Sequence, residues 1–88
     1  MKIICFEKNA FDEYQNWIQT DRKIALRIGE MVKDILRDPF KGIGKPEPLK
    51  GDFKGYWSRR INDEHRLIYK ITGTEIIIAS CYSHYGDK

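Results

Sequence analysis

Short apolar runs and regularly spaced apolar positions divide the chain into successive elements. Residues 2–6 form an Ile-rich apolar run that is too short for an ordinary helix, and we interpret it as a strand. Asn9 is a suitable N-cap, because its side-chain carbonyl can accept a backbone hydrogen bond at a helix start. Apolar side chains then follow at three- and four-residue spacing, which predicts a helix that ends near Thr20 and has one face made of Phe11, Tyr14, Trp17 and Ile18.

A second helix is predicted directly after the first. Thr20 and Asp21 are both good N-caps, and the apolar positions that follow have helical spacing: Ile24, Ile28, Met31, Val32 and Ile35. Asp38 precedes Pro39, and a proline disfavours the helical conformation of the residue before it. The helix is therefore expected to end there, and the first part of the chain to form a helical hairpin.

The rest of the chain is predicted to be a long loop followed by three strands. Residues 38–55 hold all three prolines and four of the seven glycines, as is typical of a loop. Strand-like runs follow at 56–61, 65–72 and 75–83, and the short connections between them, including a turn at Gly73, favour an antiparallel meander. The predicted fold class is α+β, with the N-terminal strand and the helical hairpin packed on an antiparallel sheet.

Alternation along the strands separates the two faces of the predicted sheet. Along residues 65–72, one face carries Leu67, Tyr69 and Ile71, and the other carries Arg66, Ile68 and Lys70. We expect the helices to cover the first face, because it is the more apolar. Arg66 is then left on the open face.

Composition limits the class of protein. A chain of 88 residues forms one domain, and 41% hydrophobic with 33% charged residues excludes an intrinsically disordered chain. No apolar run approaches the ~20 residues that span a bilayer, and the N-terminus is unlike a signal peptide, so we expect a cytoplasmic protein without membrane association. Cys5 and Cys81 lack the spacing of zinc ligands, and we interpret both as buried thiols.

The excess positive charge lies in one segment. Between Lys41 and Arg66 there are seven basic and four acidic residues, which is a difference of +3, whereas the rest of the chain has nine of each. The formal net charge of the whole chain is also +3, so this segment holds all of it. A polyanionic partner would meet this segment.

Glu47 is a candidate general base in the long loop. Prolines on both sides, Pro46 and Pro48, stiffen its backbone, and a general base has to be held within reach of a hydroxyl proton. The alternative interpretation is a solvated loop glutamate that pairs with Lys45 or Lys50. The spacing by itself leaves both interpretations open.

Three arginines on adjacent predicted strands are candidate phosphate ligands. Arg60 and Arg66 converge on one phosphate if both face the open side of the sheet, since adjacent strands lie about 4.8 Å apart. In the alternative, Arg59 or Arg60 lies over an aromatic neighbour such as Trp57 and pairs with Asp63 or Glu64 while Arg66 does the chemistry.

Two histidines have different expected roles. His84 follows the last predicted strand, next to Tyr85, and can donate a proton to a leaving oxygen if the strand exit lies beside the open face; otherwise it is a surface histidine. His65 opens a strand, and we interpret it as structural, bonding the loop before it. A base, convergent arginines and an acid are together sufficient for a metal-independent ribonuclease that uses the RNA 2′-OH as nucleophile and needs no cofactor.

The chain closely resembles the YoeB/Txe toxins of the RelE superfamily. The resemblance covers nearly the whole chain and is carried by the phrases KPEPLK, WSRRI, EHRLIY and a terminal SHY, in the same order and near the same spacing as in that family. It implies a RelE-like, microbial-RNase-like fold and the toxin of a type II toxin–antitoxin pair that cleaves mRNA in the decoding site of the 70S ribosome. It also implies a YefM/Axe-like antitoxin as partner, and homodimers in several members.

The resemblance assigns roles to individual residues. The family's base corresponds to Glu47, its phosphate-stabilising arginine to Arg66, its acid to His84 and the adjacent tyrosine to Tyr85. Its flanking basic residues correspond to Lys50 and Arg60, and the same basic segment adds Lys54 and Arg59 as candidate RNA ligands. The chain continues past Tyr85 as Gly86, Asp87 and Lys88, whereas family members often stop near the tyrosine.

Two other functions are compatible with parts of the sequence. A ParE-like toxin on the same fold would inhibit DNA gyrase by binding and would need no acid–base set. A plain RNA-binding module would use only the basic residues and the aromatic side chains. The presence of Glu47, Arg66 and His84 together favours the ribonuclease over both.

Overall fold

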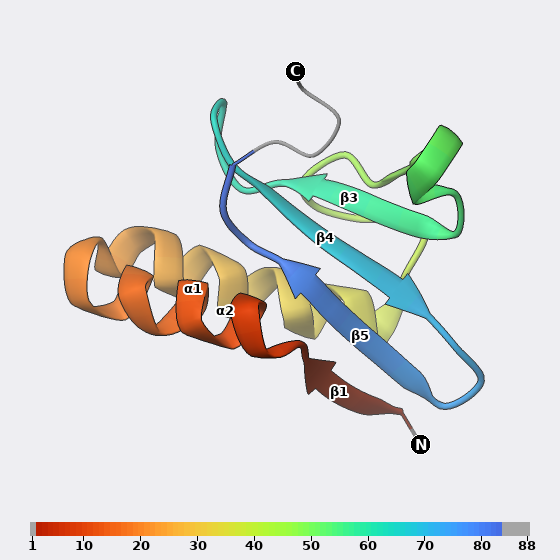
Figure 1. Ribbon diagram of the computed structural model, residues 1–88, viewed down its shortest axis with the longest axis horizontal. Helices are drawn as coiled ribbons and strands as arrows, with labels where there is room; N and C mark the ends of the chain where they lie inside the picture. Colours follow the sequence, from red (N-terminus) through yellow and green to blue (C-terminus); the bar gives the residue numbers. More distant parts are fainter. Residues whose placement is uncertain (1, 84–88) are drawn as a thin grey trace.

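Two helices cover one face of a five-stranded sheet (Figure 1). The structure is a computed structural model, and it describes residues 2–83. Along the chain, the elements are β1 (Ile3–Phe6), α1 (Lys8–Thr20), α2 (Arg22–Arg37), β2 (Glu47–Pro48), a short 3-10 helix (Gly51–Phe53), β3 (Tyr56–Arg60), β4 (Arg66–Ile71) and β5 (Glu75–Ser80). Within residues 2–83, neither helix combines the length and the apolar character that crossing a membrane requires.

The sheet has the order β1-β5-β4-β3-β2 and is mixed. Strands β3, β4 and β5 form the predicted antiparallel meander, and β2 extends it on the outer side of β3. Strand β1 lies parallel to β5, with Ile3 opposite Glu75 and Phe6 opposite Ile78. The α+β fold class is therefore confirmed, and the N-terminal strand joins the sheet as a parallel edge strand.

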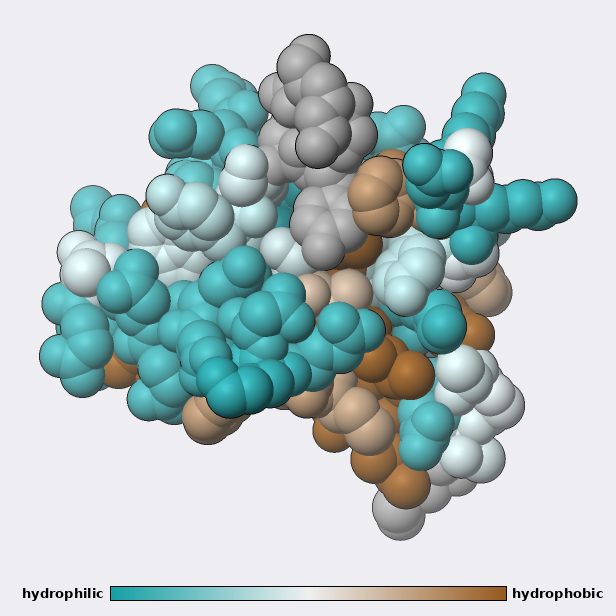
Figure 2. All heavy atoms as spheres, in the orientation of Figure 1, coloured by the Kyte–Doolittle hydropathy of each residue, from teal (hydrophilic) through white to brown (hydrophobic). Residues whose placement is uncertain are grey.

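The helical hairpin packs its apolar stripe against the sheet. Ile28, Met31 and Ile35 of α2 are fully buried, as are Leu67 and Tyr69 of β4. Burying one such aliphatic side chain contributes about 1.5–3 kcal/mol, so this interface supplies much of the stability of a small domain. Figure 2 shows the contrast between the hydrophilic outer side of the helices and the hydrophobic side chains that gather near β1.

The predicted start of the first helix is wrong by two residues. The N-cap is Glu7, and Asn9 lies inside α1, where its side-chain amide donates to the carbonyl of Ala79 at 3.2 Å. The backbone N–H of Glu7 still pairs with β5, so the chain passes from strand to helix without a spacer. The second cap is confirmed, because the Asp21 carboxylate accepts from the backbone N–H of Ile24.

The long loop between α2 and β3 has more structure than predicted. Its second half contains β2, in which Glu47 lies opposite Ser58 and Pro48 opposite Trp57, and then the 3-10 helix. Two residues are enough for this pairing because the backbone on either side is also held: Leu49 donates to the carbonyl of Tyr56. The loop is thus joined to the sheet as an edge strand.

The first half of the loop wraps around a buried arginine. The Arg59 side chain is 0% exposed, and its Nη1 forms an ion pair with the Asp34 carboxylate at 2.6 Å. Its Nε donates to the hydroxyl of Tyr69 at 3.1 Å. Its two terminal nitrogens also donate to three loop carbonyls, those of Asp38, Lys41 and Ile43.

Glycine allows this close wrapping. Gly42 has a φ of +135°, and a Cβ there would collide with the Asp34 carboxylate. Gly44 has a φ of +79°, and its carbonyl accepts from the backbone N–H of Arg60 at 2.6 Å. The loop therefore lies against α2 at Gly42 and against β3 at Gly44, at distances that a side chain at these positions would prevent.

We expect Arg59→Ala to lower the free energy of unfolding by about 3–5 kcal/mol, because it removes one partner of a buried ion pair and leaves loop carbonyls without a donor. The matched control is Arg60→Ala, the exposed neighbour, which should change stability by less than about 0.5 kcal/mol. Urea unfolding followed by circular dichroism measures both. Equal stabilities for the two variants would contradict the role given to Arg59.

The ion pair also predicts how stability depends on pH. Hydrogen bonds from Arg59, and then from the backbone of Ile43 and from Arg37, lower the pKa of Asp34 from 3.8 to about 2. Because the folded pKa is depressed, the stabilisation is fully present above about pH 4 and is lost as pH falls toward about 2. The stability difference between the wild type and Asp34→Asn should shrink across this window in urea titrations. A constant difference would contradict the charged pair.

Candidate functional site

The face of the sheet opposite the helices brings together residues from three strands. Arg60 on β3 lies directly opposite Arg66 on β4, and Glu47 on β2 lies opposite Ser58, two residues before Arg60. Paired residues point to the same side of a sheet, and so do residues two apart in a strand. Glu47, Arg60 and Arg66 therefore share one face, while Arg59 and Leu67 point to the helices.

The spacing of these residues follows from the hydrogen-bonded pairing of β2, β3 and β4. Directly opposite residues of an antiparallel pair have Cα atoms about 4.5–5.5 Å apart, so Arg60 and Arg66 start from neighbouring positions. Glu47 is one strand further out, about 4.8 Å beyond β3, and is displaced by two residues along it. A carboxylate and two guanidinium groups can thus reach one ligand the size of a nucleotide.

Glu47 is exposed on its edge strand. Within residues 2–83 its carboxylate takes part in no ion pair, so the predicted alternative, a pair with Lys45 or Lys50, is not formed there. The backbone is held by β3 on one side and by its flanking prolines, Pro46 and Pro48. A fixed backbone with an unpaired carboxylate is the arrangement that a general base requires.

Arg66 is held at one end of its guanidinium. Nη1 donates to the carbonyls of Asn62 at 2.7 Å and His65 at 3.2 Å, both in the β3–β4 turn. In the described part of the chain, Nη2 and Nε donate to no acceptor. Because one edge of the guanidinium is fixed and the other has no acceptor among residues 2–83, Arg66 can present two parallel N–H groups to a phosphate.

The other predicted basic ligands surround this face. Arg60 is exposed, and its side chain makes no hydrogen bond or ion pair within residues 2–83. Lys50 and Lys54 lie at the two ends of the 3-10 helix that follows β2, and both side chains are exposed. Lys70 also reaches this face, where its Nζ lies 5.2 Å from the ring centre of Tyr56. The sequence placed Lys70 on the open face but gave no reason to assign it a role.

Arg59 has to be removed from the set of RNA ligands. It is buried on the helix side, with its guanidinium bonded to Asp34, Tyr69 and the loop, so no donor is left for a phosphate. The predicted partners Asp63 and Glu64 are also wrong for this residue. The true partner, Asp34, is 25 residues away in the sequence, and no local pattern identifies it.

The predicted acid and its neighbour, His84 and Tyr85, lie outside the described residues, as does the tail from Gly86 to Lys88. The last described residue, Ser83, lies beside Arg66: its carbonyl accepts from the Arg66 backbone N–H at 2.9 Å. The residue that precedes His84 in the chain is therefore next to the arginine of the candidate site.

The two cysteines are free thiols in different surroundings. Cys81 is buried, as predicted, and burial, together with the nearby Glu13 carboxylate, raises the pKa of its thiol to about 12. Cys5 is only half-buried, which differs from the prediction, because β1 is an edge strand. Within residues 2–83, His, Cys, Asp and Glu side chains do not gather in groups of three or more that could hold a metal ion.

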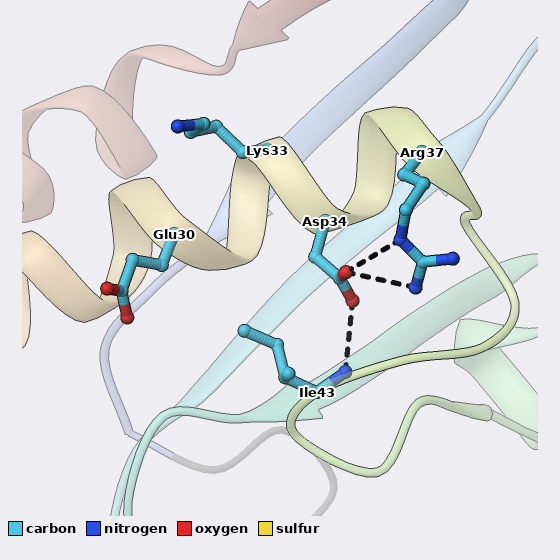
Figure 3. A pocket seen from close by; sticks show the side chains of 5 residues that line it. All are labelled: Glu30, Lys33, Asp34, Arg37 and Ile43. Atoms are coloured by element: carbon cyan, nitrogen blue, oxygen red, sulfur yellow. Dashed lines mark hydrogen bonds and ion pairs between the residues drawn. The ribbon is translucent and has the colours of Figure 1, made fainter.

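A shallow pocket on α2 lies apart from these residues. Its lining is shown in Figure 3 and consists of Glu30, Lys33, Asp34, Arg37 and Ile43. The Asp34 carboxylate accepts hydrogen bonds from the Arg37 side chain and from the backbone N–H of Ile43, and it also binds Arg59. The pocket is the outer surface of the Arg59 network and contains none of the predicted site residues.

Sequence comparison identifies close relatives over nearly the whole chain. The family model of the YoeB-like toxin of bacterial type II toxin-antitoxin systems matches residues 6–85. Toxin YoeB of Streptomyces coelicolor is 52% identical over 82 residues, which cover 93% of this chain and 98% of that protein. Toxin YoeB of Escherichia coli K12 is 49% identical over 85 residues, covering 97% and 100%.

Solved structures have the same architecture. A YoeB/ParE toxin from Agrobacterium tumefaciens superposes with a TM-score of 0.93 at 41% identity, covering 97% of this chain and 100% of that one. The YoeB dimer from Staphylococcus aureus superposes with a TM-score of 0.89 at 47% identity, covering 96% of this chain and 98% of that one. YafQ from E. coli, at 17% identity and a TM-score of 0.79, shares the fold alone.

The family match therefore extends from the end of β1 to beyond the last described residue, and the relatives align over nearly their full length. The fold of the solved YoeB structures is also that of this chain, including the helical hairpin on the five-stranded sheet. This chain belongs to the YoeB-like toxins of bacterial type II toxin-antitoxin systems.

Proposed function

We propose that this toxin is a ribosome-dependent endoribonuclease that cleaves mRNA in the A site of the 70S ribosome and so inhibits translation. The observation that carries the proposal is the grouping of Glu47, whose carboxylate forms no ion pair in the described part of the chain, with Arg60 and Arg66 on the face of the sheet opposite the helices. Ser83, which leads to His84, lies beside the same arginine. The resemblance to the toxin family assigns its base to Glu47, its arginine to Arg66 and its acid to His84.

The chemistry needs only groups of the toxin and of the RNA. Glu47 takes the proton of the 2′-OH, the 2′-oxygen bonds to phosphorus, and the bond from phosphorus to the 5′-oxygen breaks. His84 gives a proton to the departing 5′-oxygen, with Tyr85 beside it, and the products are a 2′,3′-cyclic phosphate and a 5′-hydroxyl. Arg66 stabilises the extra negative charge on the phosphorane, so neither a metal nor another cofactor takes part.

The open shape of the site gives a reason for ribosome dependence. Glu47 and Arg60 are exposed on a sheet face rather than in a deep cleft, so the toxin by itself holds an RNA strand only loosely. Correct alignment of a 2′-OH with its phosphate contributes several orders of magnitude to such a reaction. We propose that the ribosome supplies that alignment, while Lys50, Lys54 and Arg60 bind the surrounding phosphates.

Relatives with known assemblies suggest the protein partners. Staphylococcus aureus YoeB has been solved as a dimer and in a heterotetrameric complex with YefM. We propose that this chain likewise forms homodimers, is neutralised by a YefM-like antitoxin, and acts in the cytoplasm, where it meets ribosomes. The second candidate function is gyrase inhibition, because the A. tumefaciens neighbour is described as a YoeB/ParE toxin.

We expect Glu47→Gln to lower the rate of cleavage by about 10²-fold or more, since the amide keeps the size of the side chain but cannot accept the proton. The assay is primer extension on a defined mRNA with and without programmed ribosomes. Glu30→Gln on α2 makes the same chemical change at an exposed position away from the site and should cleave at the wild-type rate. Absence of cleavage by folded, antitoxin-free wild type would favour the gyrase-binding alternative.

We expect Arg60→Ala to weaken RNA binding and to reduce the slope of log affinity against log salt by about 0.7, the value for one contact to a single-stranded phosphate. Arg22→Ala, an exposed arginine of α2, is the matched control and should leave the slope unchanged. Filter binding or anisotropy with a short RNA at several salt concentrations measures the slope. An identical slope for Arg60→Ala and wild type would remove Arg60 from the phosphate ligands.

A further inference from the structure

The chain that leaves β5 is held by the half-buried Glu13 and the buried Trp17 of α1. The Glu13 carboxylate of α1 accepts from the Cys81 backbone N–H at 2.8 Å and from the Ser80 hydroxyl at 3.2 Å. The indole N–H of Trp17 donates to the Cys81 carbonyl at 2.9 Å. Helix α1 therefore determines the direction in which the chain continues past the sheet.

His65 also holds the segment that follows β5. It is 7% exposed and packs against two aromatic rings, with centroids 4.8 Å from Trp17 and 4.9 Å from Tyr82, which also contact each other at 5.6 Å. Its Nδ1 accepts from the backbone N–H of Ser83 at 2.8 Å. An imidazole nitrogen accepts only when it carries no proton, so the proton of the neutral ring is on Nε2, which faces the Glu64 carboxylate at 3.7 Å.

Ser83 is held on both sides of its peptide backbone. His65 binds its N–H, and the backbone N–H of Arg66 binds its carbonyl at 2.9 Å. Ser83 also has a φ of +69°, in the left-handed region that residues other than glycine rarely adopt. Such a conformation costs about 1–3 kcal/mol and persists only where surrounding contacts enforce it. The two hydrogen bonds are the contacts that do so.

His65 itself is placed by the turn before it. The Asn62 side-chain carbonyl accepts from the backbone N–H of His65 at 2.7 Å and from that of Glu64 at 2.9 Å. The Asn62 and His65 backbone carbonyls accept from Arg66. One turn thus orients both the guanidinium that faces the candidate site and the imidazole that holds Ser83.

We propose that His65 is a positioning residue for cleavage: its Nδ1 holds Ser83 in the left-handed conformation beside Arg66 and so sets the point and direction from which His84 extends. The inference rests on the function proposed above, in which His84 is the acid. His65 touches neither the RNA nor the reacting atoms. It acts through the backbone of the residue that precedes the acid.

Two substitutions of His65 distinguish the effect of its hydrogen-bond acceptor, Nδ1, from the effect of its ring packing. His65→Phe keeps an aromatic ring against Trp17 and Tyr82 but has no acceptor, whereas His65→Asn carries a carbonyl oxygen near the position of Nδ1. We expect His65→Phe to lower kcat by about 10²-fold with KM nearly unchanged, because a misplaced acid slows the chemical step and not binding. His65→Asn should recover most of that loss. Adding His65→Phe to His84→Ala should cause no further loss.

The hydrogen bond can be observed without any activity. In the nitrogen-15-labelled toxin, an N–H···N bond gives a scalar coupling between the Ser83 amide nitrogen and His65 Nδ1, and the Ser83 amide should exchange slowly with solvent. His65→Phe should remove the coupling and accelerate the exchange. If His65→Phe does not fold, Ser83→Pro removes the N–H donor and, because proline fixes φ near −65°, also excludes the left-handed conformation at residue 83, so it should lower kcat in the same way.

The outcomes distinguish this inference from the proposed function. Absence of the coupling in the wild type would overturn the inference, whatever the cleavage rate. A coupling that is present, combined with full activity of a folded His65→Phe, would also overturn it. Wild-type toxin that shows the coupling but never cleaves mRNA on ribosomes would refute the proposed function and, with it, the catalytic consequence of the hydrogen bond. Rescue by His65→Asn and the absence of a further loss in the double variant support the inference.

Discussion

The buried guanidinium of Arg59 is the constraint on which the rest of the structure depends. A planar group with five N–H donors inside a protein needs acceptors in several directions, and here they come from α2, from β4 and from the loop. Without Asp34 the positive charge would be buried without a partner. Without the loop carbonyls several donors would be unsatisfied. The requirement to satisfy one side chain thus determines how the loop, which has few apolar residues, lies on the sheet.

The positions of the residues on the open face of the sheet depend on this arrangement. Because the loop is bound to Arg59 and to the end of β3, it returns along β3 as β2 and places Glu47 opposite Ser58. The other half of the site is built in the same manner from the β3–β4 turn, where Asn62 and His65 hold Arg66 and Ser83. Two buried polar side chains, Arg59 on the loop side and His65 on the turn side, therefore help to position the site.

Much of this fold follows from patterns that are local in the sequence. Helical spacing of apolar residues identifies both helices, and short alternating runs identify the meander, because each element has to turn one apolar side to the core. The N-cap predicted at Asn9 is wrong because Glu7, whose N–H is held by β5, already accepts from the Phe11 backbone N–H through its carbonyl and so starts the helix earlier. The parallel pairing of β1 and the edge strand β2 also depend on distant partners, which local spacing does not contain.

The sequence by itself determined the helical hairpin, the meander, the family of the chain and the candidates Glu47, Arg60 and Arg66. The elements follow from periodicity, and the family and the candidates follow from sequence phrases that lie along the chain in the order found in that family. Only the tertiary structure decided which of Arg59 and Arg60 is buried and which is available to a ligand. Both are arginines in the same strand and differ by one position, so they point to opposite faces: one meets Asp34 in the interior and the other meets solvent. The physical reason is that burial and pairing are properties of the residues that surround a side chain, and these come from parts of the sequence far away.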